Sequence, residues 1–235
     1  MPVNKSSPAL IDPVQVVEFR EHDSFRYLFR RGEIEIVHKG GGAFSGKLVT
    51  ANLEGCGLEF GWWGQPVLAR GTVRPGGPGF IFTLDPKLPC RFLGQEVDES
   101  MFGAYRPGAE HCAASGSAYP WCFMSFETAE FDAALARSGG RLPASSPSGA
   151  EILRTNPALL ANATRVFCAL RESMVADGAR LGHPEVQRSI KSTMLATGVG
   201  LISSDDGRDR SGAVRAQSRL RIVRRAEEYV HSRNH

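Results

Sequence analysis

The amino-acid sequence predicts an α+β fold, in which a double-stranded β-barrel is followed by a helical hairpin. Three observations support this prediction: short strand-like runs between residues 25 and 126, two amphipathic helical stripes between residues 150 and 202, and a polar segment after them. The 235 residues are 42% hydrophobic and 23% charged, values that are normal for a folded protein. We therefore expect an ordinary hydrophobic core that needs no disulfide or metal to hold it together.

The strand-like runs have a side-chain period of two, which is typical of a sheet with one buried and one solvated face. Ile34 and Ile36 alternate with glutamates. Phe60 and Trp62 stand on either side of a glycine. About eight such strands in some 100 residues, separated by glycine clusters, favour a barrel or jelly-roll sandwich of the cupin type over an α/β sheet. The clearest runs are Ile34–Val37, Gly46–Val49, Leu58–Trp62 and Phe80–Leu84.

Helical patterns begin near residue 127. Thr128 can cap a short helix that ends at about Ser138, and a linker rich in glycine, proline and serine follows. Apolar residues then recur at three- and four-residue spacing in a helix that ends at Asp177-Gly178. Pro184 suits the first turn of a second helix, so the two form a hairpin.

The C-terminal part changes character again. Residues 203–212 contain no apolar side chain, which predicts a flexible linker. Residues 218–231 are amphipathic and basic, and a single helix of this length is marginally stable in water without a partner. We therefore expect this segment to start a separate unit.

Charge and cysteine content exclude several classes of protein. A net charge of +3 is too small for a stand-alone nucleic-acid coat. The five cysteines form an odd set without a C-x-x-C pair, so neither a disulfide framework nor a thiolate zinc site is indicated. No run approaches the roughly 20 apolar residues of a membrane span. We expect a cytoplasmic protein that makes no membrane contact.

The segment Arg219–Val230 resembles the opening helix of the DNA-binding module in the AraC/XylS family of transcription regulators. Tyr105–Glu110, and Trp121–Phe126 with the short helix after it, also look like the barrel of one regulator subfamily. In that family a β-barrel effector domain and a pair of dimerisation helices precede a module of two helix-turn-helix units. The residues alone predict the same order of elements.

The resemblance implies a domain organisation and a limit on DNA binding. We expect no sequence-specific DNA recognition, because the chain stops at His235 and no second helix follows to enter a major groove. Weak backbone contact is expected from Arg219, Arg224 and Arg225. The implied parts are a sensory barrel at 13–140, a dimerisation hairpin at 150–202, a linker at 203–217 and the first helix of the missing module at 218–235.

An enzyme is disfavoured. Metal-dependent cupins place two histidines one residue apart on a strand, whereas the six histidines here are scattered singly. His111 and Glu110 would face opposite sides of a strand. No Gly-x-Ser-x-Gly elbow or phosphate loop occurs. We expect no catalytic residue, metal or cofactor, and two alternatives stay open: a metal-dependent cupin dioxygenase or isomerase, and an effector-free module that binds another protein.

Effector binding in the barrel and homodimerisation through the hairpin are the functions that the resemblance implies. Strand spacing places Phe60, Trp62 and Phe82 on one face, which we expect to be the inner one, with Trp121 and the polar Arg70 completing the pocket. The hairpin stripe presents more apolar surface than a barrel hides, so we expect a homodimer. Its expected contact residues are Leu160, Ala163, Phe167, Leu170, Met174, Ile190 and Met194.

Overall fold

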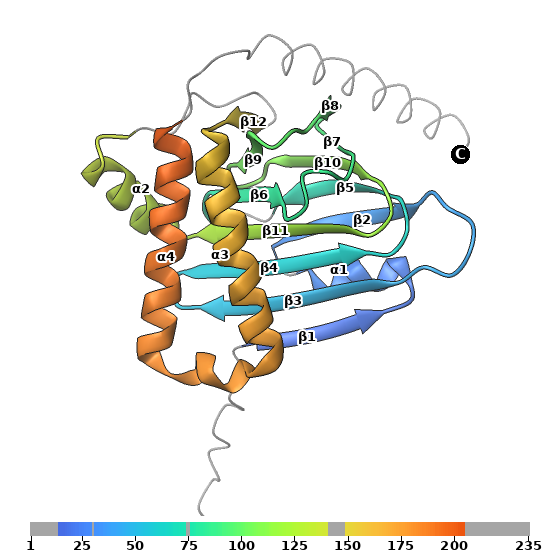
Figure 1. Ribbon diagram of the computed structural model, residues 1–235, viewed down its shortest axis with the longest axis horizontal. Coiled ribbons are helices and arrows are strands. Elements are labelled where there is room, and N and C mark those ends of the chain that lie inside the picture. Colours follow the sequence, from blue (N-terminus) through green and yellow to red (C-terminus); the bar gives the residue numbers. More distant parts are fainter. Residues whose placement is uncertain (1–13, 30, 74–75, 141–148, 205–235) are drawn as a thin grey trace, which may run out of the picture.

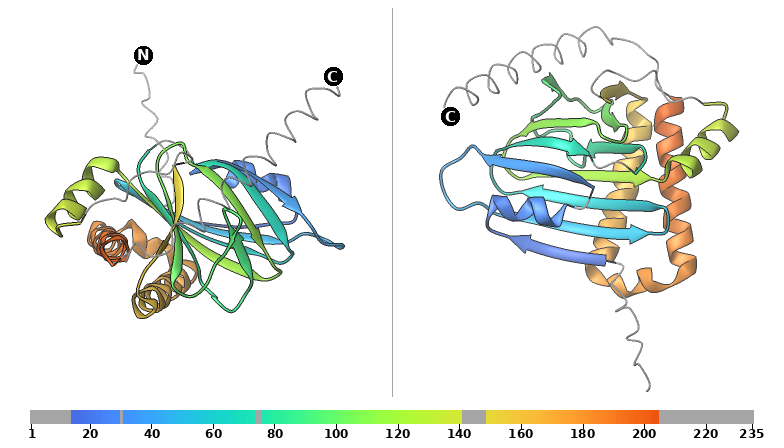
Figure 2. Two further views of the ribbon diagram at one scale, coloured as in Figure 1. Left: turned by 90° about the horizontal axis from the view of Figure 1, so that it is seen from above. Right: turned by 180° about the vertical axis from the view of Figure 1, so that it is seen from behind.

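The computed structural model describes residues 14–29, 31–73, 76–140 and 149–204. In this part of the chain two antiparallel sheets face each other, and helices cover the outer face of the larger sheet (Figures 1 and 2). This is the predicted α+β, jelly-roll type of architecture. The strands form two separate sheets rather than one closed barrel.

The larger sheet has seven strands in the order β1-β3-β4-β11-β6-β9-β12. All neighbouring strands in it are antiparallel. In that order the strands are Val14–Phe19, Gly46–Leu53, Cys56–Trp63, Tyr119–Phe126, Gly79–Thr83, Met101–Tyr105 and Ala150–Arg154.

The smaller sheet has five antiparallel strands in the order β2-β5-β10-β7-β8. Its strands are Gly32–His38, Val67–Val73, Glu110–Ser115, Cys90–Phe92 and Gln95–Glu96. In β2 the predicted alternation is confirmed, because Ile34 and Ile36 are buried while Glu33 and Glu35 are exposed.

Two long helices form the predicted hairpin. α3 (Pro157–Ala176) begins after Asn156, whose side chain accepts a hydrogen bond of 2.9 Å from the Ala158 amide. It ends at Asp177, as expected, and α4 (Pro184–Ser203) starts with its proline. The other helical elements are η1 (His22–Ser24), α1 (Phe25–Leu28), α2 (Thr128–Arg137) and η2 (Gly178–Gly182).

The structure corrects two expected boundaries. Residues 150–154, expected within the hairpin, form β12 and pair with β9. A helix is disfavoured there because the residue before a proline, here Asn156, avoids the helical conformation. Phe25–Leu28, expected as strand, forms the short helix α1, which crosses from the edge of one sheet to the edge of the other.

The two sides of the larger sheet contribute to two different cores. Between the sheets lies the inner core, which is rich in aromatic residues. Between the larger sheet and α2, α3 and α4 lies the outer core. Cys122 shows how one strand serves both: it pairs with Phe60 and Phe82 and shares the outer core with them, while its neighbours Trp121 and Phe123 belong to the inner core.

Candidate functional site

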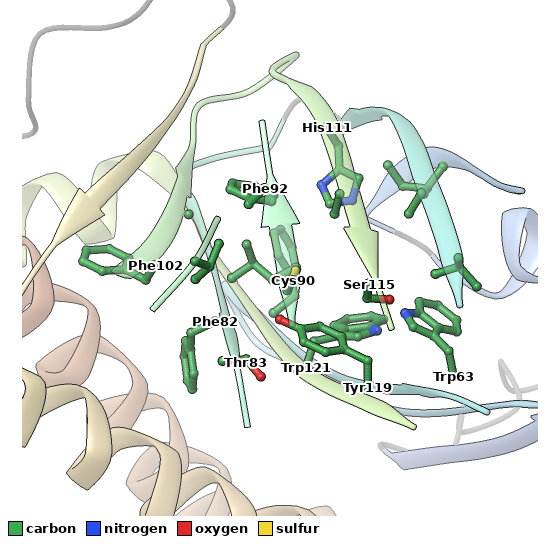
Figure 3. A pocket seen from close by; sticks show the side chains of 18 of the residues that line it. Trp63, Phe82, Thr83, Cys90, Phe92, Phe102, His111, Ser115, Tyr119 and Trp121 are labelled. Carbon is green, nitrogen blue, oxygen red and sulfur yellow. The ribbon is translucent and has the colours of Figure 1, made fainter. Parts of the chain in front are cut away.

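A cavity lies within the inner core (Figure 3). The volume open to the centre of a water-sized sphere is about 60 Å³. One water needs only about 10–15 Å³ measured in this way, so the space exceeds an ordinary packing defect. Aromatic side chains form much of the lining: Phe25, Phe29, Trp63, Phe82, Phe92, Phe102, Tyr105, Tyr119, Trp121 and Phe123.

Glycines in the larger sheet position the aromatic rings. Gly61 of β4 stands directly opposite Trp121 of β11, and a Cβ at position 61 would lie 2.0 Å from the indole ring. Gly103 of β9 makes similar room for Phe92, which reaches across from the smaller sheet; a Cβ there would lie 2.3 Å from its ring. Both glycines therefore allow close approach of a ring to the strand, a known use of glycine in strands.

Two phenylalanines at the ends of α1 line one side of the cavity: Phe25 is its first residue, and Phe29 directly follows it. Phe25 stacks on Phe29 with their ring centroids 5.3 Å apart. Phe25 also meets Trp63 edge-on at 4.9 Å, and Phe29 meets Trp121 edge-on at 6.2 Å. These are favourable aromatic geometries, so the two rings help to hold α1 against the sandwich.

A histidine and a tyrosine form a polar pair across the cavity. The Tyr105 hydroxyl on β9 lies 2.5 Å from Nδ1 of His111 on β10, so the bond joins the two sheets. Burial lowers the pKa of His111 to about 4, because a charged imidazole loses its hydration there. Burial also raises the pKa of Tyr105 well above its ordinary value. Both groups are therefore neutral near pH 7.

A second polar group consists of Tyr119, Cys90 and Thr83. The Tyr119 hydroxyl interacts with the Cys90 thiol and the Thr83 hydroxyl, and burial raises the pKa of both Tyr119 and Cys90. Thr83 Oγ1 also donates to the Asp85 carbonyl over 3.0 Å. Among the residues that the structure describes, none of those lining the cavity is Lys, Arg, Asp or Glu. This described lining is therefore electrically neutral at physiological pH.

Two polar atoms of the lining have no hydrogen-bond partner among the residues that the structure describes. They are Nε1 of Trp121 and Oγ of Ser115, and both atoms are buried. Trp121 is only 5% exposed. Buried donors are nearly always paired, so two orphans in one cavity need an explanation.

The structure places the predicted pocket residues in three environments. Trp121 lines the cavity as expected. Phe82 borders it, but the Phe82 ring packs edge-on against Phe167 of α3 with centroids 5.8 Å apart. Phe60 does not line the cavity, since it lies in the outer core with its ring 6.5 Å from the same Phe167.

The expected positions of Trp62 and Arg70 are also corrected. Trp62 shares the outer face with Phe60 and is 37% exposed. Arg70 of β5 lies on the outside of the smaller sheet, where its Nε is 3.2 Å from a Glu35 oxygen. Phe60, Trp62 and Phe82 alternate as predicted, but their shared face is the helix-covered one rather than the interior.

Several lining residues were not expected from the sequence. Trp63 directly follows Trp62 on the same strand and therefore points to the opposite face. Had that face been taken as the inner one, Trp63 would have been predicted as a lining residue. Gly61 within the strand is a further signal, because glycine in a strand often marks close approach of another group. Phe25, Phe29 and His111 carry no comparable signal, since their place depends on how distant elements pack.

The predicted dimerisation residues are mostly buried within one chain. Six of the seven are between 0% and 7% exposed and pack in the outer core, and Leu170 is half-buried. The hairpin stripe therefore packs against the outer face of the sheet, where the buried residues that meet it are apolar or thiol side chains. The residues in this buried set are Leu160, Ala163, Phe167, Met174, Ile190 and Met194.

Other expectations concern residues beyond those described. The linker past residue 204, the helix expected at 218–235, and Arg219, Arg224 and Arg225 lie outside the described residues. None of the described helices combines the length and the apolar character that crossing a membrane requires. The described residues also contain no group of three or more His, Cys, Asp or Glu side chains placed to hold a metal ion.

Comparison with known proteins supports the fold. The solved structure of the AraC-like transcriptional activator CuxR is similar over 80% of this chain and 70% of its own, with a TM-score of 0.53 and 10% identity. An apo ToxT variant from Vibrio cholerae matches over 72% of this chain and 62% of its own, with a TM-score of 0.35 and 6% identity. No family model and no curated protein matches the sequence. The likeness to CuxR confirms the fold that the AraC/XylS resemblance implies, and that neighbour is a regulator rather than an enzyme.

Proposed function

We propose that the described part of the chain is the effector-binding region of a transcription regulator. The observation that carries this proposal is the aromatic cavity with two buried, unpartnered donors, in a fold shared with an AraC-like activator. Such a concave, mostly apolar site with a few polar groups is the usual form of a small-molecule site. The signal would pass to a C-terminal helix-turn-helix module that recognises DNA.

The larger sheet supplies a route from the cavity to the hairpin. Phe82 borders the cavity, and its ring contacts Phe167 of α3 on the other side of the sheet. Trp121 lines the cavity next to Cys122, which is wholly buried in the outer core. A ligand that moves β6 or β11 therefore changes the surface of the sheet against which the hairpin packs. The coupling free energy of such a shift is typically about 1–3 kcal/mol.

We also propose that the chain forms a homodimer, through the outer side of α3 rather than the buried stripe. Leu159 and Val166 are 43% and 37% exposed, and Ala169 and Ala176 continue the same side of the helix. These positions are spaced by seven or three residues, the spacing of a helix–helix seam. A second copy of α3 presents the same seam and fits a two-fold interface.

A seam variant tests the dimer. Val166→Asp places a charge in the seam and should lower the dimer fraction at micromolar concentration, as measured by light scattering, while the unfolding midpoint of the chain changes little. Glu172→Asp is the matched control, because Glu172 is an exposed residue of α3 that is not part of the seam, and the change retains its charge. A parent chain that is monomeric at 100 µM would contradict the proposal.

Filling the cavity tests effector binding. Ala113 of β10 lines the cavity, whereas its neighbour Ala114 does not. In a reporter strain that carries the full-length regulator, Ala113→Leu should abolish the response to inducing conditions. Ala114→Leu should leave the response intact. Equal responses in the parent and the Ala113 variant, with both proteins folded, would contradict the proposed site.

A further inference from the structure

The chemistry of the cavity indicates a class of ligand. We propose that it binds a small neutral molecule that accepts hydrogen bonds, such as a short ketone, aldehyde or amide, and that it excludes carboxylates and phosphates. This inference rests on the proposed effector function. It uses three properties of the cavity: its neutrality, its unpartnered donors and its volume.

Neutrality excludes anions. In the described part of the chain, the residues lining the cavity include no Lys or Arg to pair with a carboxylate. The one imidazole among these described residues, His111, bonds to the Tyr105 hydroxyl through Nδ1 and is uncharged near pH 7. An anion transferred from water into this cavity would lose its hydration without gaining a counter-charge, which is strongly unfavourable. A neutral molecule avoids that penalty.

The two unpartnered donors select for acceptor atoms. Ser115 is held by main-chain pairing with Val67 of β5 and Cys90 of β7, so its hydroxyl has a defined place. Trp121 lies against Gly61, which leaves the indole ring little freedom. A phenylalanine would fill much of the same space without burying an N–H group, so packing alone does not account for a tryptophan here. A carbonyl oxygen satisfies such a donor.

The volume selects for a short molecule. An engineered protein cavity of about 150 Å³ holds benzene. The space here is about 60 Å³. A molecule larger than benzene therefore does not fit, whereas short acyclic compounds fall at or below that limit.

Three probes of equal size separate these properties: 2-butanone, 2-methyl-1-butene and propionate. The first has a carbonyl acceptor, the second has none, and the third is an anion at pH 7. The full chain is labelled with ¹⁵N-tryptophan, which yields indole N–H signals from three residues only. We expect 2-butanone to move the Trp121 signal with saturation, while the signal of Trp62, which lies outside the cavity, stays still. The alkene should bind more weakly than the ketone, and propionate should move neither signal.

Variants show whether the donors act as proposed. Trp121→Phe and Ser115→Ala should each weaken 2-butanone binding about 2- to 10-fold, the worth of one hydrogen bond, and leave alkene binding unchanged. Binding to the Trp121 variant is followed by the Trp63 signal. Ser125→Ala is the matched control: its hydroxyl is also buried without a described partner, on the same strand as Trp121 but outside the cavity lining. It should change nothing.

Particular results would overturn the inference. Propionate binding as tightly as 2-butanone would show that the neutral class is wrong, while effector binding in the cavity would stand. Equal affinities for ketone and alkene, or unchanged ketone binding in both variants, would remove the role of the donors. If neither the three probes nor a broad panel of metabolites stabilised the chain, the inference and the proposed function would both be wrong.

Discussion

The two faces of the seven-stranded sheet are made by the same strands but differ in packing and in hydrogen bonding. On the outer face, the buried residues of β4, β11 and β6 are apolar or thiol side chains packed against helices. On the inner face, Trp121 keeps an unpartnered N–H beside a cavity. The closely packed outer face holds the strands in place, and the same strands carry the cavity on their inner face. The comparison indicates that stability and binding are divided between the two faces.

The largest effect is expected on the outer face. Phe167 is 0% exposed and packs against Phe60 and Phe82. Phe167→Ala should lower the free energy of unfolding by about 3–5 kcal/mol, because a filled core is emptied. Denaturant unfolding measures this, with Val166→Ala as the control from the exposed side of α3. A loss below about 1 kcal/mol would show that the outer face is not the tightly packed one.

Acid should lower stability through the inner core, where His111 of β10 in the smaller sheet faces the larger sheet. The pKa of His111 is about 4 in the folded chain and 6.5 as its ordinary value, so the unfolded chain takes up a proton first as the pH falls. The contribution of His111 to the free energy of unfolding should be constant above pH 6.5 and should decrease between pH 6.5 and 4, by about 3 kcal/mol. His111→Gln removes the titration and should flatten this part of the profile. The same slope in parent and variant would show that His111 is not the group responsible.

A smaller effect should follow from an added methyl group at Gly61. Gly61→Ala places a Cβ 2.0 Å from the Trp121 ring, so the indole must move, at about 1–3 kcal/mol. The loss should shrink when Trp121 is also replaced by alanine, and unfolding of the four proteins in this double-mutant cycle measures the coupling. Additive losses would mean that the ring does not depend on this glycine. Tryptophan fluorescence of the single variant reports the movement independently.

The sequence by itself determined the local features. Ile34 and Ile36 define a strand through their period, and Asp177-Gly178 and Pro184 set the ends of the two long helices. These features depend on backbone conformation and on neighbours a few residues away. Their physical causes therefore lie within the segments themselves.

Only the tertiary structure decided which face each strand turns inward. Alternation places Phe60 and Phe82 together, but a strand covered by helices on one side and a second sheet on the other is buried on both sides. The same limit applies to the hairpin stripe: Phe167 must be buried, yet its spacing does not distinguish a sheet from a second copy. The Tyr105–His111 bond likewise exists only because β9 and β10 belong to facing sheets. Periodicity within a segment carries no information about what covers it, because the covering element comes from elsewhere in the chain.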